Sequence, residues 1–229
     1  MGEKCYKNRG EQVLSTLKRE ILTLELKPGQ SISENEICMR FDVSRTPVRE
    51  ALRRLQEQGF VHTIPYSGTY VTLLNLKNIR EMIYMRVAVE LMVIRDFMKI
   101  ATPLLYEEVR HQIRCQELLI QDAGFEPEAF YKMDAQMHAI WFQATGKTSL
   151  WEFIQAQQLH YTRFRMLDFV TETDFSRIVN EHAQMLACME TNDERGLEEI
   201  LKKHLYISIT RMKDAIESDY KEYFEKEED

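Results

Sequence analysis

Four residues that can bind a metal fall on the apolar faces of helices expected from the sequence. Asp134 and His138 are four residues apart, so they stack on one helical face, and the rest of that face is apolar. His182 and His204 lie in the same way within the apolar stripes of two later helices. A buried carboxylate needs a partner, and a bound cation is a suitable one. Three imidazoles and one carboxylate suit a divalent first-row metal with open coordination positions, so we predict a metal site here. Zinc is favoured, and nickel, manganese or iron could use the same ligands.

The alternative is that these four residues are separate core groups, each satisfied by its own hydrogen bond. That interpretation is the better one for any single buried histidine, because most such residues are merely hydrogen-bonded. Here the sequence places four polar groups on three helices of one bundle, and their convergence favours the metal. The other three histidines, His62, His111 and His160, do not join the set.

The elements that must hold these four residues are all helical. From about residue 77 onward the apolar positions follow a helical period, interrupted by Pro and Gly. The expected helices span residues 78–100, 102–123, 127–146, 149–168, 174–191 and 193–223. The sequence therefore predicts an all-α bundle of about six helices as a second domain, residues 77–229.

A second set of candidate residues lies nearer the N-terminus, on a helix expected over residues 44–59. Ser44 is a good N-cap for this helix. Arg45, Arg49 and Arg53 are four residues apart and line a face different from the apolar one. Such a helix suits a DNA major groove, whereas the alternative is an ordinary solvated basic face. Arg53 is expected to pair with neighbouring glutamates rather than with DNA.

The elements around this helix favour DNA binding. Apolar residues at helical spacing predict a helix over residues 10–25, and a capping box at Ser33 begins another helix that ends near residue 41. Two β-like runs, residues 60–64 and 69–73, are joined by a turn. Three helices followed by a hairpin predict a winged helix-turn-helix domain over residues 1–76, so the whole fold is expected to be mainly α.

The charge distribution agrees with two domains of different function. The 229-residue chain has a net charge of −7, which is unusual for a nucleic-acid binder. Residues 1–76 carry 11 Lys and Arg against 9 Asp and Glu, whereas the remainder carries 19 against 28. A weakly basic domain must depend on specific DNA contacts, and its binding should be salt-sensitive. No apolar run approaches the roughly 18 residues of a membrane helix, so we expect a cytoplasmic protein with no membrane partner.

The first domain resembles a known family. Residues 10–73 are similar to the DNA-binding domain of the GntR family of bacterial transcription regulators. The similarity is carried by Lys27-Pro28-Gly29, Ser31-Ile32-Ser33-Glu34, the Ser44–Glu50 stretch followed by Ala-Leu-Arg-Arg-Leu, and Gly59-Phe60-Val61 with the Gly68 wing. The resemblance implies that the DNA-facing residues are Asn35, Ser44, Arg45, Thr46, Pro47, Arg49, Ser67 and Gly68. In that pattern the two arginines contact guanine edges or phosphates, and the wing tip contacts the minor groove or sugars.

The second domain resembles the C-terminal effector domain of the FadR-type branch of that family. The matching signature is Asp-x-x-x-His at Asp134–His138, then Glu181-His182, then His204-Leu205. By this resemblance the metal holds a small carboxylate effector through its open positions. Arg86 stands where the family has an arginine, and a buried guanidinium there would bind a carboxylate through two hydrogen bonds. The alternative, left open, is an intrahelical pair between Arg86 and Glu90. Weaker candidates for the same role are Arg163 and Arg165.

These features predict a metabolite-sensing transcription regulator that is not an enzyme. Its expected partners are a double-stranded DNA operator, a small carboxylate effector and a second copy of the chain, because winged-helix proteins of this class read paired half-sites. One alternative is a metalloenzyme fused to a DNA-binding head. A di-iron bundle needs two Glu-x-x-His pairs, and the chain has only Glu108–His111, outside the metal set. The other alternative is an architectural DNA binder with a structural metal.

Overall fold

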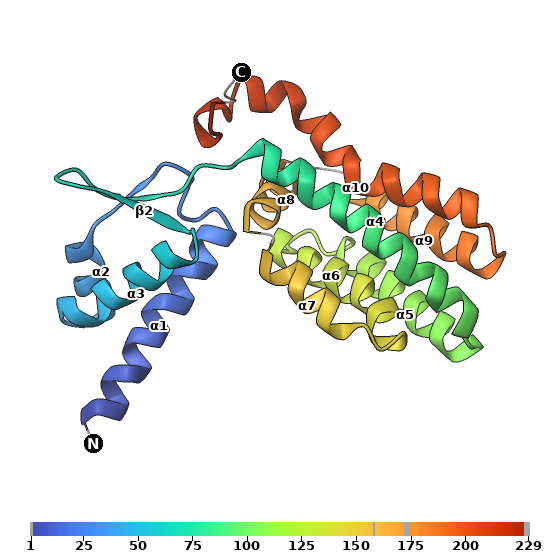
Figure 1. Ribbon diagram of the computed structural model, residues 1–229, viewed down its shortest axis with the longest axis horizontal. Coiled ribbons are helices and arrows are strands. Elements are labelled where there is room, and N and C mark those ends of the chain that lie inside the picture. Colours follow the sequence, from blue (N-terminus) through green and yellow to red (C-terminus); the bar gives the residue numbers. More distant parts are fainter. Residues whose placement is uncertain (1, 158, 172–174, 227–229) are drawn as a thin grey trace. The chain divides into compact units, whose positions relative to one another are not determined.

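The computed structural model describes residues 2–157, 159–171 and 175–226, with side chains described from residue 9 onward. The chain divides into two compact units. The winged-helix unit contains Met1–Leu76 together with Ala215–Asp229, and the bundle unit contains Lys77–Asp214. The fold is mainly helical, with a winged helix-turn-helix in one unit and a helical bundle in the other, as the sequence predicts (Figure 1).

Three helices form the body of the winged-helix unit: α1 (Gly2–Leu22), α2 (Glu34–Phe41) and α3 (Arg45–Glu57). The Ser33 side chain accepts a hydrogen bond from the Glu36 N–H, so the predicted N-cap of α2 is confirmed. The apolar pattern predicts that α1 continues to residue 25, but the helix ends at Leu22. It ends early because Leu24 has a left-handed backbone with φ +63°, which a right-handed helix cannot include. The apolar faces of α1 and α3 pack together and bury Val13, Leu17, Ile21, Val48 and Leu55.

A three-stranded antiparallel sheet forms the wing, in the order β1-β3-β2. The predicted hairpin is present as β2 (Val61–Ile64) and β3 (Gly68–Val71), with Thr63 opposite Thr69. The strand β1 (Ser31–Ile32) adds to the other edge of β3. Sequence reasoning missed this strand because a segment of two residues carries no periodic signal.

The end of the chain packs within the winged-helix unit. A short 3₁₀-helix, Lys221–Tyr223, leads to Phe224, which is buried and forms a parallel bridge with Leu74. The Leu74 N–H donates to the Tyr223 carbonyl oxygen (2.8 Å), and the Glu225 N–H donates to the Leu74 carbonyl oxygen (2.9 Å). The compact unit thus includes a C-terminal segment that lies outside the expected domain of residues 1–76.

The bundle unit contains seven helices within the described residues. They are α4 (Leu76–Ile100), α5 (Pro103–Leu119), α6 (Pro127–Ala144), α7 (Thr148–Gln157), α8 (Leu159–Thr171), α9 (Ser176–Glu190) and α10 (Glu194–Glu217). The one helix expected over residues 149–168 corresponds to α7 and α8. Residue 158 lies outside the described residues, and so does residue 174, the expected start of α9.

Helix α8 is buried among other helices, and this explains why its apolar residues do not follow a clear helical period. Seven consecutive residues, 163–169, are buried. A surface helix has one apolar stripe, whereas a helix buried on all sides has none. As a result α8 brings three charged side chains, Arg163, Arg165 and Asp168, into the interior of the bundle.

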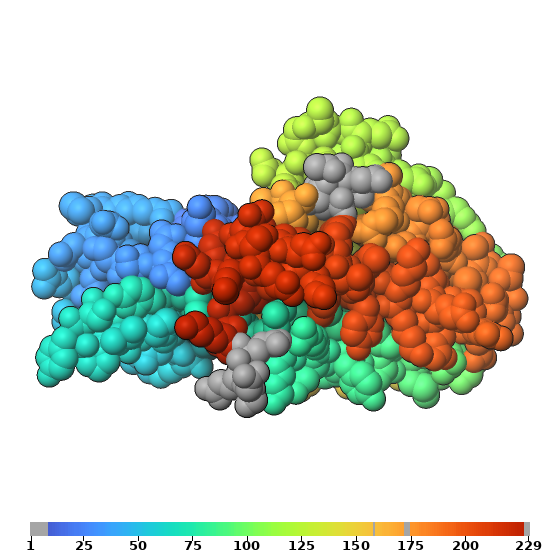
Figure 2. Space-filling view, turned by 90° about the horizontal axis from the view of Figure 1, so that it is seen from above, coloured from blue at the N-terminus to red at the C-terminus, as the bar shows by residue number. Residues whose placement is uncertain are grey.

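Helices α4 and α10 lie side by side along one face of the bundle (Figures 1 and 2). Arg95 on α4 forms ion pairs with Glu194 (3.0 Å) and Glu198 (3.2 Å) on α10. The opposite side of α4 is apolar and faces the core, where Ile83 and Phe97 are fully buried. Across the described part of the chain, none of the helices is long and apolar enough to cross a membrane.

Candidate metal centre and DNA-reading surface

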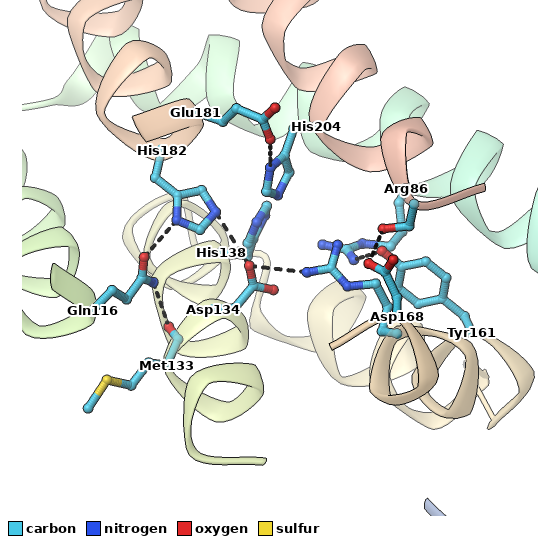
Figure 3. A network of polar contacts seen from close by, with 12 residues as sticks. Arg86, Gln116, Met133, Asp134, His138, Tyr161, Asp168, Glu181, His182 and His204 are labelled. Carbon is cyan, nitrogen blue, oxygen red and sulfur yellow. Dashed lines mark hydrogen bonds and ion pairs between the residues drawn. The ribbon is translucent and has the colours of Figure 1, made fainter. Parts of the chain in front are cut away.

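The four predicted metal ligands come together in the interior of the bundle. Figure 3 shows Asp134 and His138 on α6 meeting His182 from α9 and His204 from α10. One ligand atom of each residue lies within 4.8 Å of those of the other three. All four side chains are buried, and the ring centroids of His182 and His204 are 4.7 Å apart. The inward polar positions seen in the sequence therefore belong to one cluster.

Each of the three imidazoles is held at its Nδ1 atom by another side chain. The pairs are His138 with Glu90 Oε2 (2.6 Å), His182 with Gln116 Oε1 (2.7 Å) and His204 with Glu181 Oε2 (3.0 Å). The three Nε2 atoms are also buried, yet none of them makes a hydrogen bond to any described residue. The ring nitrogens that remain for a metal are thus the ones that face the cluster.

The Asp134 carboxylate completes the cluster. Its Oδ1 atom lies 3.4 Å from His182 Nε2 and 3.5 Å from an Arg165 terminal nitrogen. Burial by itself raises the pKa of Asp134, but the nearby Arg165 charge holds that pKa well below its usual range. The carboxylate is therefore ionised at neutral pH, which is the state in which it binds a cation.

His182 and His204 are in the protonation state that metal binding requires. Burial lowers the pKa of His182, although its contact with Asp134 opposes the change. Burial, together with the neighbouring imidazoles, holds the pKa of His204 well below its usual range. Because an imidazole binds a metal through a neutral nitrogen, these rings are ready for ligation without first losing a proton.

Arg86 forms the intrahelical pair that the sequence left open. Its Nε–H donates to Glu90 Oε1 (2.5 Å), and a terminal nitrogen donates to the Tyr161 hydroxyl (2.7 Å). The guanidinium also lies over the rings of Tyr161 and Trp151. Although burial raises the pKa of Glu90, the Arg86 charge and the hydrogen bonds from His138 and Arg86 lower it to about 2. The Glu90 carboxylate thus joins Arg86 directly to a metal-ligand candidate.

Sequence reasoning missed the role of the residues behind the imidazoles. The sequence indicates Glu90 only as a partner for Arg86 and Glu181 only as the neighbour of His182, and it predicts no role for Gln116. A signal for Gln116 existed, because it follows Val109 and Ile113 at helical spacing and is a polar residue in an apolar stripe.

The DNA-facing residues predicted by resemblance gather on one part of the winged-helix unit. Ser44, Arg45, Thr46 and Arg49 are exposed at the start of α3, Pro47 is half-buried there, and Asn35 is exposed on α2. Ser44 is the N-cap residue of α3, but its side chain makes no capping hydrogen bond. Its hydroxyl and the α3 N-terminus are therefore suited to a phosphate.

The three arginines of α3 differ in their contacts. Arg45 donates to the Asn35 side-chain oxygen (3.1 Å), and the Arg49 Nε–H donates to Glu34 (3.0 Å). Arg53 instead lies between two glutamates of its own helix, Glu50 and Glu57. The expected pairing of Arg53 with neighbouring glutamates is confirmed.

The wing tip is exposed, as the resemblance requires. Ser67 and Gly68 are both at the surface, and the Ser67 hydroxyl is 2.7 Å from that of Tyr70. Gly68 has φ +148°, a conformation that side-chain-bearing residues rarely adopt. Tyr66 is fully exposed in the same turn, and the sequence predicts no role for it.

Comparisons with known proteins match both units. Residues 9–71 match the family described as bacterial regulatory proteins, gntR family, and residues 81–206 match the FCD domain. A winged helix-turn-helix followed by such a helical domain defines a DNA-binding transcription regulator with an effector-binding domain. The chain belongs to the GntR family of bacterial transcription regulators, and its C-terminal domain is an FCD domain of the FadR type.

Proteins of similar sequence are named as transcriptional repressors. The HTH-type transcriptional repressor RspR of Escherichia coli K12 is 25% identical over 195 residues, which is 85% of each chain. The gluconate operon transcriptional repressor of Bacillus subtilis is 25% identical over 189 residues, which is 80% of this chain and 76% of that one. Among solved structures, E. coli McbR/YncC has a TM-score of 0.69 at 18% identity and covers 90% of this chain and 98% of its own. That likeness shows a shared fold.

Proposed function

We propose that a small carboxylate metabolite controls the affinity of this regulator for its DNA operator. In this proposal the metabolite binds a divalent metal held by Asp134, His138, His182 and His204, and the protein acts as a cytoplasmic homodimer without enzymatic activity. The observation that carries the proposal is the set of three buried Nε2 atoms that make no hydrogen bond to any described residue. They surround an ionised carboxylate, and a cation would satisfy all four groups at once.

The donor set suits a borderline first-row metal. Three imidazole nitrogens and one carboxylate oxygen favour zinc, and nickel, manganese or iron could use the same ligands. Four protein ligands leave positions open on a metal that accepts five or six. When bound, the metal would supply a Lewis-acid centre to which carboxylate oxygens of a metabolite can bind.

The local charges support an anionic effector. Asp134 is shared with Arg165, and Glu90 is shared with Arg86, so each buried carboxylate already has a cationic partner. The lowered pKa values of His182 and His204 leave these two rings without a charge at neutral pH. A divalent cation therefore brings positive charge that these side chains do not neutralise, and an anion in the same dry interior would offset it.

Arg86 is proposed as a further effector contact. Two of its five N–H donors are used by Glu90 and Tyr161, so others remain for a carboxylate. The pair with Glu90 and the effector contact are therefore compatible roles for one guanidinium.

The site includes one residue from each of the two helices that connect the units along the chain. His204 is on α10, which continues to Glu217, beyond the boundary between Asp214 and Ala215. Glu90 is on α4, which begins at Leu76, the last residue before the other boundary. A change in the site can thus reach the winged-helix unit through either helix. Coupling between two such sites is typically about 1–3 kcal/mol.

The exposed face of α4 supports the proposed dimer. Tyr84 and Met92 are eight residues apart, so they share one face, and they are 71% and 58% exposed. Ala88 lies between them and is also exposed. A second copy of the chain would cover this stripe. Light scattering coupled to size-exclusion chromatography would show twice the chain mass, and a monomer would contradict the dimer.

Elemental analysis and an operator-binding titration test the proposal together. The purified protein should contain about one metal per chain, and a chelator should remove it. Addition of small carboxylates to the metal-loaded protein should change operator affinity about 5–150-fold for at least one compound, as expected for typical coupling. Turnover of a carboxylate would favour the metalloenzyme, and an operator affinity that no metabolite changes would favour the architectural binder.

A further inference from the structure

We propose that Glu90, Gln116 and Glu181 are positioning residues that fix the tautomer of the three cluster histidines. Each would hold the imidazole proton on Nδ1, so that the lone pair of every Nε2 faces the centre of the cluster. This inference deepens the proposed metal site and rests on it for its function. It concerns hydrogen-bond direction, however, and can be tested on the metal-free protein.

Glu90 lies between two donors. Arg86 donates its Nε–H to Glu90 Oε1 (2.5 Å), and His138 Nδ1 lies 2.6 Å from Glu90 Oε2. An arginine has no acceptor atom, and an ionised carboxylate has no donor. Since Glu90 is completely buried, the short contact with His138 must be a hydrogen bond donated by the ring. The His138 proton is therefore on Nδ1, and its Nε2 has the lone pair.

Gln116 holds the His182 ring through its side-chain amide. Its side-chain nitrogen donates to the Met133 carbonyl oxygen (3.3 Å), which can only accept. This contact turns the Gln116 oxygen toward His182 Nδ1, at 2.7 Å (Figure 3). An amide oxygen cannot donate, so the hydrogen bond to Gln116 requires a proton on His182 Nδ1.

Glu181 contacts His204 in the same way as Glu90 contacts His138. Its Oε2 atom is 3.0 Å from His204 Nδ1. Its Oε1 atom is 3.3 Å from an Arg177 nitrogen and 3.8 Å from the Lys203 ammonium, and both of these groups only donate. His204 is therefore held with its proton on Nδ1 as well.

Whether each position has a carboxylate or an amide agrees with the hydrogen-bond donors and acceptors around it. Glu90 and Glu181 each face donors on both oxygens, and only a carboxylate accepts on both sides. Gln116 faces one donor and one acceptor, and only an amide satisfies both. A metal-ligating histidine usually has such an outer partner, and its loss typically weakens metal binding about 10–100-fold.

Glu90→Gln is the most informative variant because it keeps the shape of the side chain and replaces one carboxylate oxygen by an amide nitrogen. If the new amide nitrogen faces Arg86, two donors meet in a buried site. If it faces His138, it donates to Nδ1 and moves the ring proton to Nε2, where it blocks a metal. Either outcome should lower zinc affinity about 10–100-fold. Glu152→Gln is the matched control, since Glu152 is exposed on α7.

The experiment is nitrogen-15 NMR of the histidine rings in the metal-free protein, followed by a zinc competition titration against a chromogenic chelator. The wild-type spectrum should show three buried rings protonated at Nδ1. Glu90→Gln should disturb the His138 signals and weaken zinc binding, whereas Glu152→Gln should do neither. Glu181→Gln should act on His204 and leave His138 unchanged.

Two results would overturn the inference. One is a wild-type spectrum with the proton on Nε2 of His138, His182 or His204, which needs no variant to fold. The other is a folded Glu90→Gln protein with unchanged ring signals and unchanged zinc affinity. A wild-type protein with the expected tautomers that takes up no metal would instead refute the proposed metal site and support the positioning roles.

Discussion

Arg49 on α3 donates its Nε–H to the Glu34 carboxylate on α2 over 3.0 Å. The contact crosses the turn between the two helices, where Asp42 ends α2 in a left-handed conformation with φ +49°. This hydrogen bond involves only the Nε atom of the Arg49 guanidinium. The two terminal nitrogens make no hydrogen bond to any described residue, so Arg49 keeps four N–H donors for the DNA contact that we predict for it.

Arg49→Ala should weaken operator binding by about 1–3 kcal/mol, because a directed guanidinium is lost from the DNA-reading surface. The dependence of binding on salt should also become shallower by about one ion if the lost contact is to a phosphate. Fluorescence anisotropy with a duplex selected by the wild-type protein measures both quantities. Arg53→Ala is the matched control: Arg53 pairs with glutamates on its own helix, so operator affinity should stay within about 0.5 kcal/mol. Equal losses in the two variants would contradict the assignment.

His182→Ala should remove the metal and leave DNA binding intact. The variant loses a ligand nitrogen, and since loss of an outer partner already costs about 10–100-fold, the loss of affinity should exceed about 100-fold. Metal content after dialysis, measured beside circular dichroism, checks the result. His111→Ala should keep its metal, because His111 is exposed on α5 and lies outside the cluster. Full metal content in a folded His182→Ala protein would show that the ligand set is wrong.

The metal-free protein should lose stability as the pH falls below the ordinary histidine pKa of 6.5. The pKa values of His182 and His204 are lowered in the folded state, so in this range the unfolded chain binds more protons than the native one. Unfolding therefore becomes more favourable with every step toward acid. A second loss should follow below about pH 4, because the pKa values of Glu90 and Asp134 are also lowered on folding. Urea midpoints measured in the presence of a chelator test this dependence.

The double variant His182→Leu with His204→Leu provides the control for the first step. If it folds, its stability should change less between about pH 7 and about pH 5, since both groups that take up protons on unfolding are gone. A slope as steep as that of the wild-type protein would mean that other groups cause the acid sensitivity.

Phe224→Ala should destabilise the winged-helix unit. Phe224 is buried against this unit and forms the bridge to Leu74, so truncation leaves a cavity whose cost is typically about 3–5 kcal/mol for a phenylalanine. Hydrogen exchange should show faster opening at Leu74 and in β3. Glu222→Ala, two residues earlier and exposed, should cost less than about 0.5 kcal/mol. Similar protection in both variants would show that the C-terminal segment does not support the unit.

The sequence by itself determined the class of the fold and the members of the cluster. The helical period, the capping box at Ser33 and the glycine of the wing are local signals, and the structure follows each of them. Asp134, His138, His182 and His204 could be chosen because each interrupts an apolar stripe, and a polar residue facing a core must have a partner. That reasoning needs only the direction in which a side chain points on its own helix.

The tertiary structure alone decided how those side chains are held. The partners of the three histidines are 48, 66 and 23 residues away along the chain, a separation that no helical period spans. The same holds for β1, whose two residues become a strand only because β3 lies beside them, and for Phe224, which packs against Leu74 from the far end of the chain. Periodicity indicates which face of an element is buried, but contact between elements depends on how they pack, and this is why the hydrogen-bond partners could not be predicted from the spacing of residues.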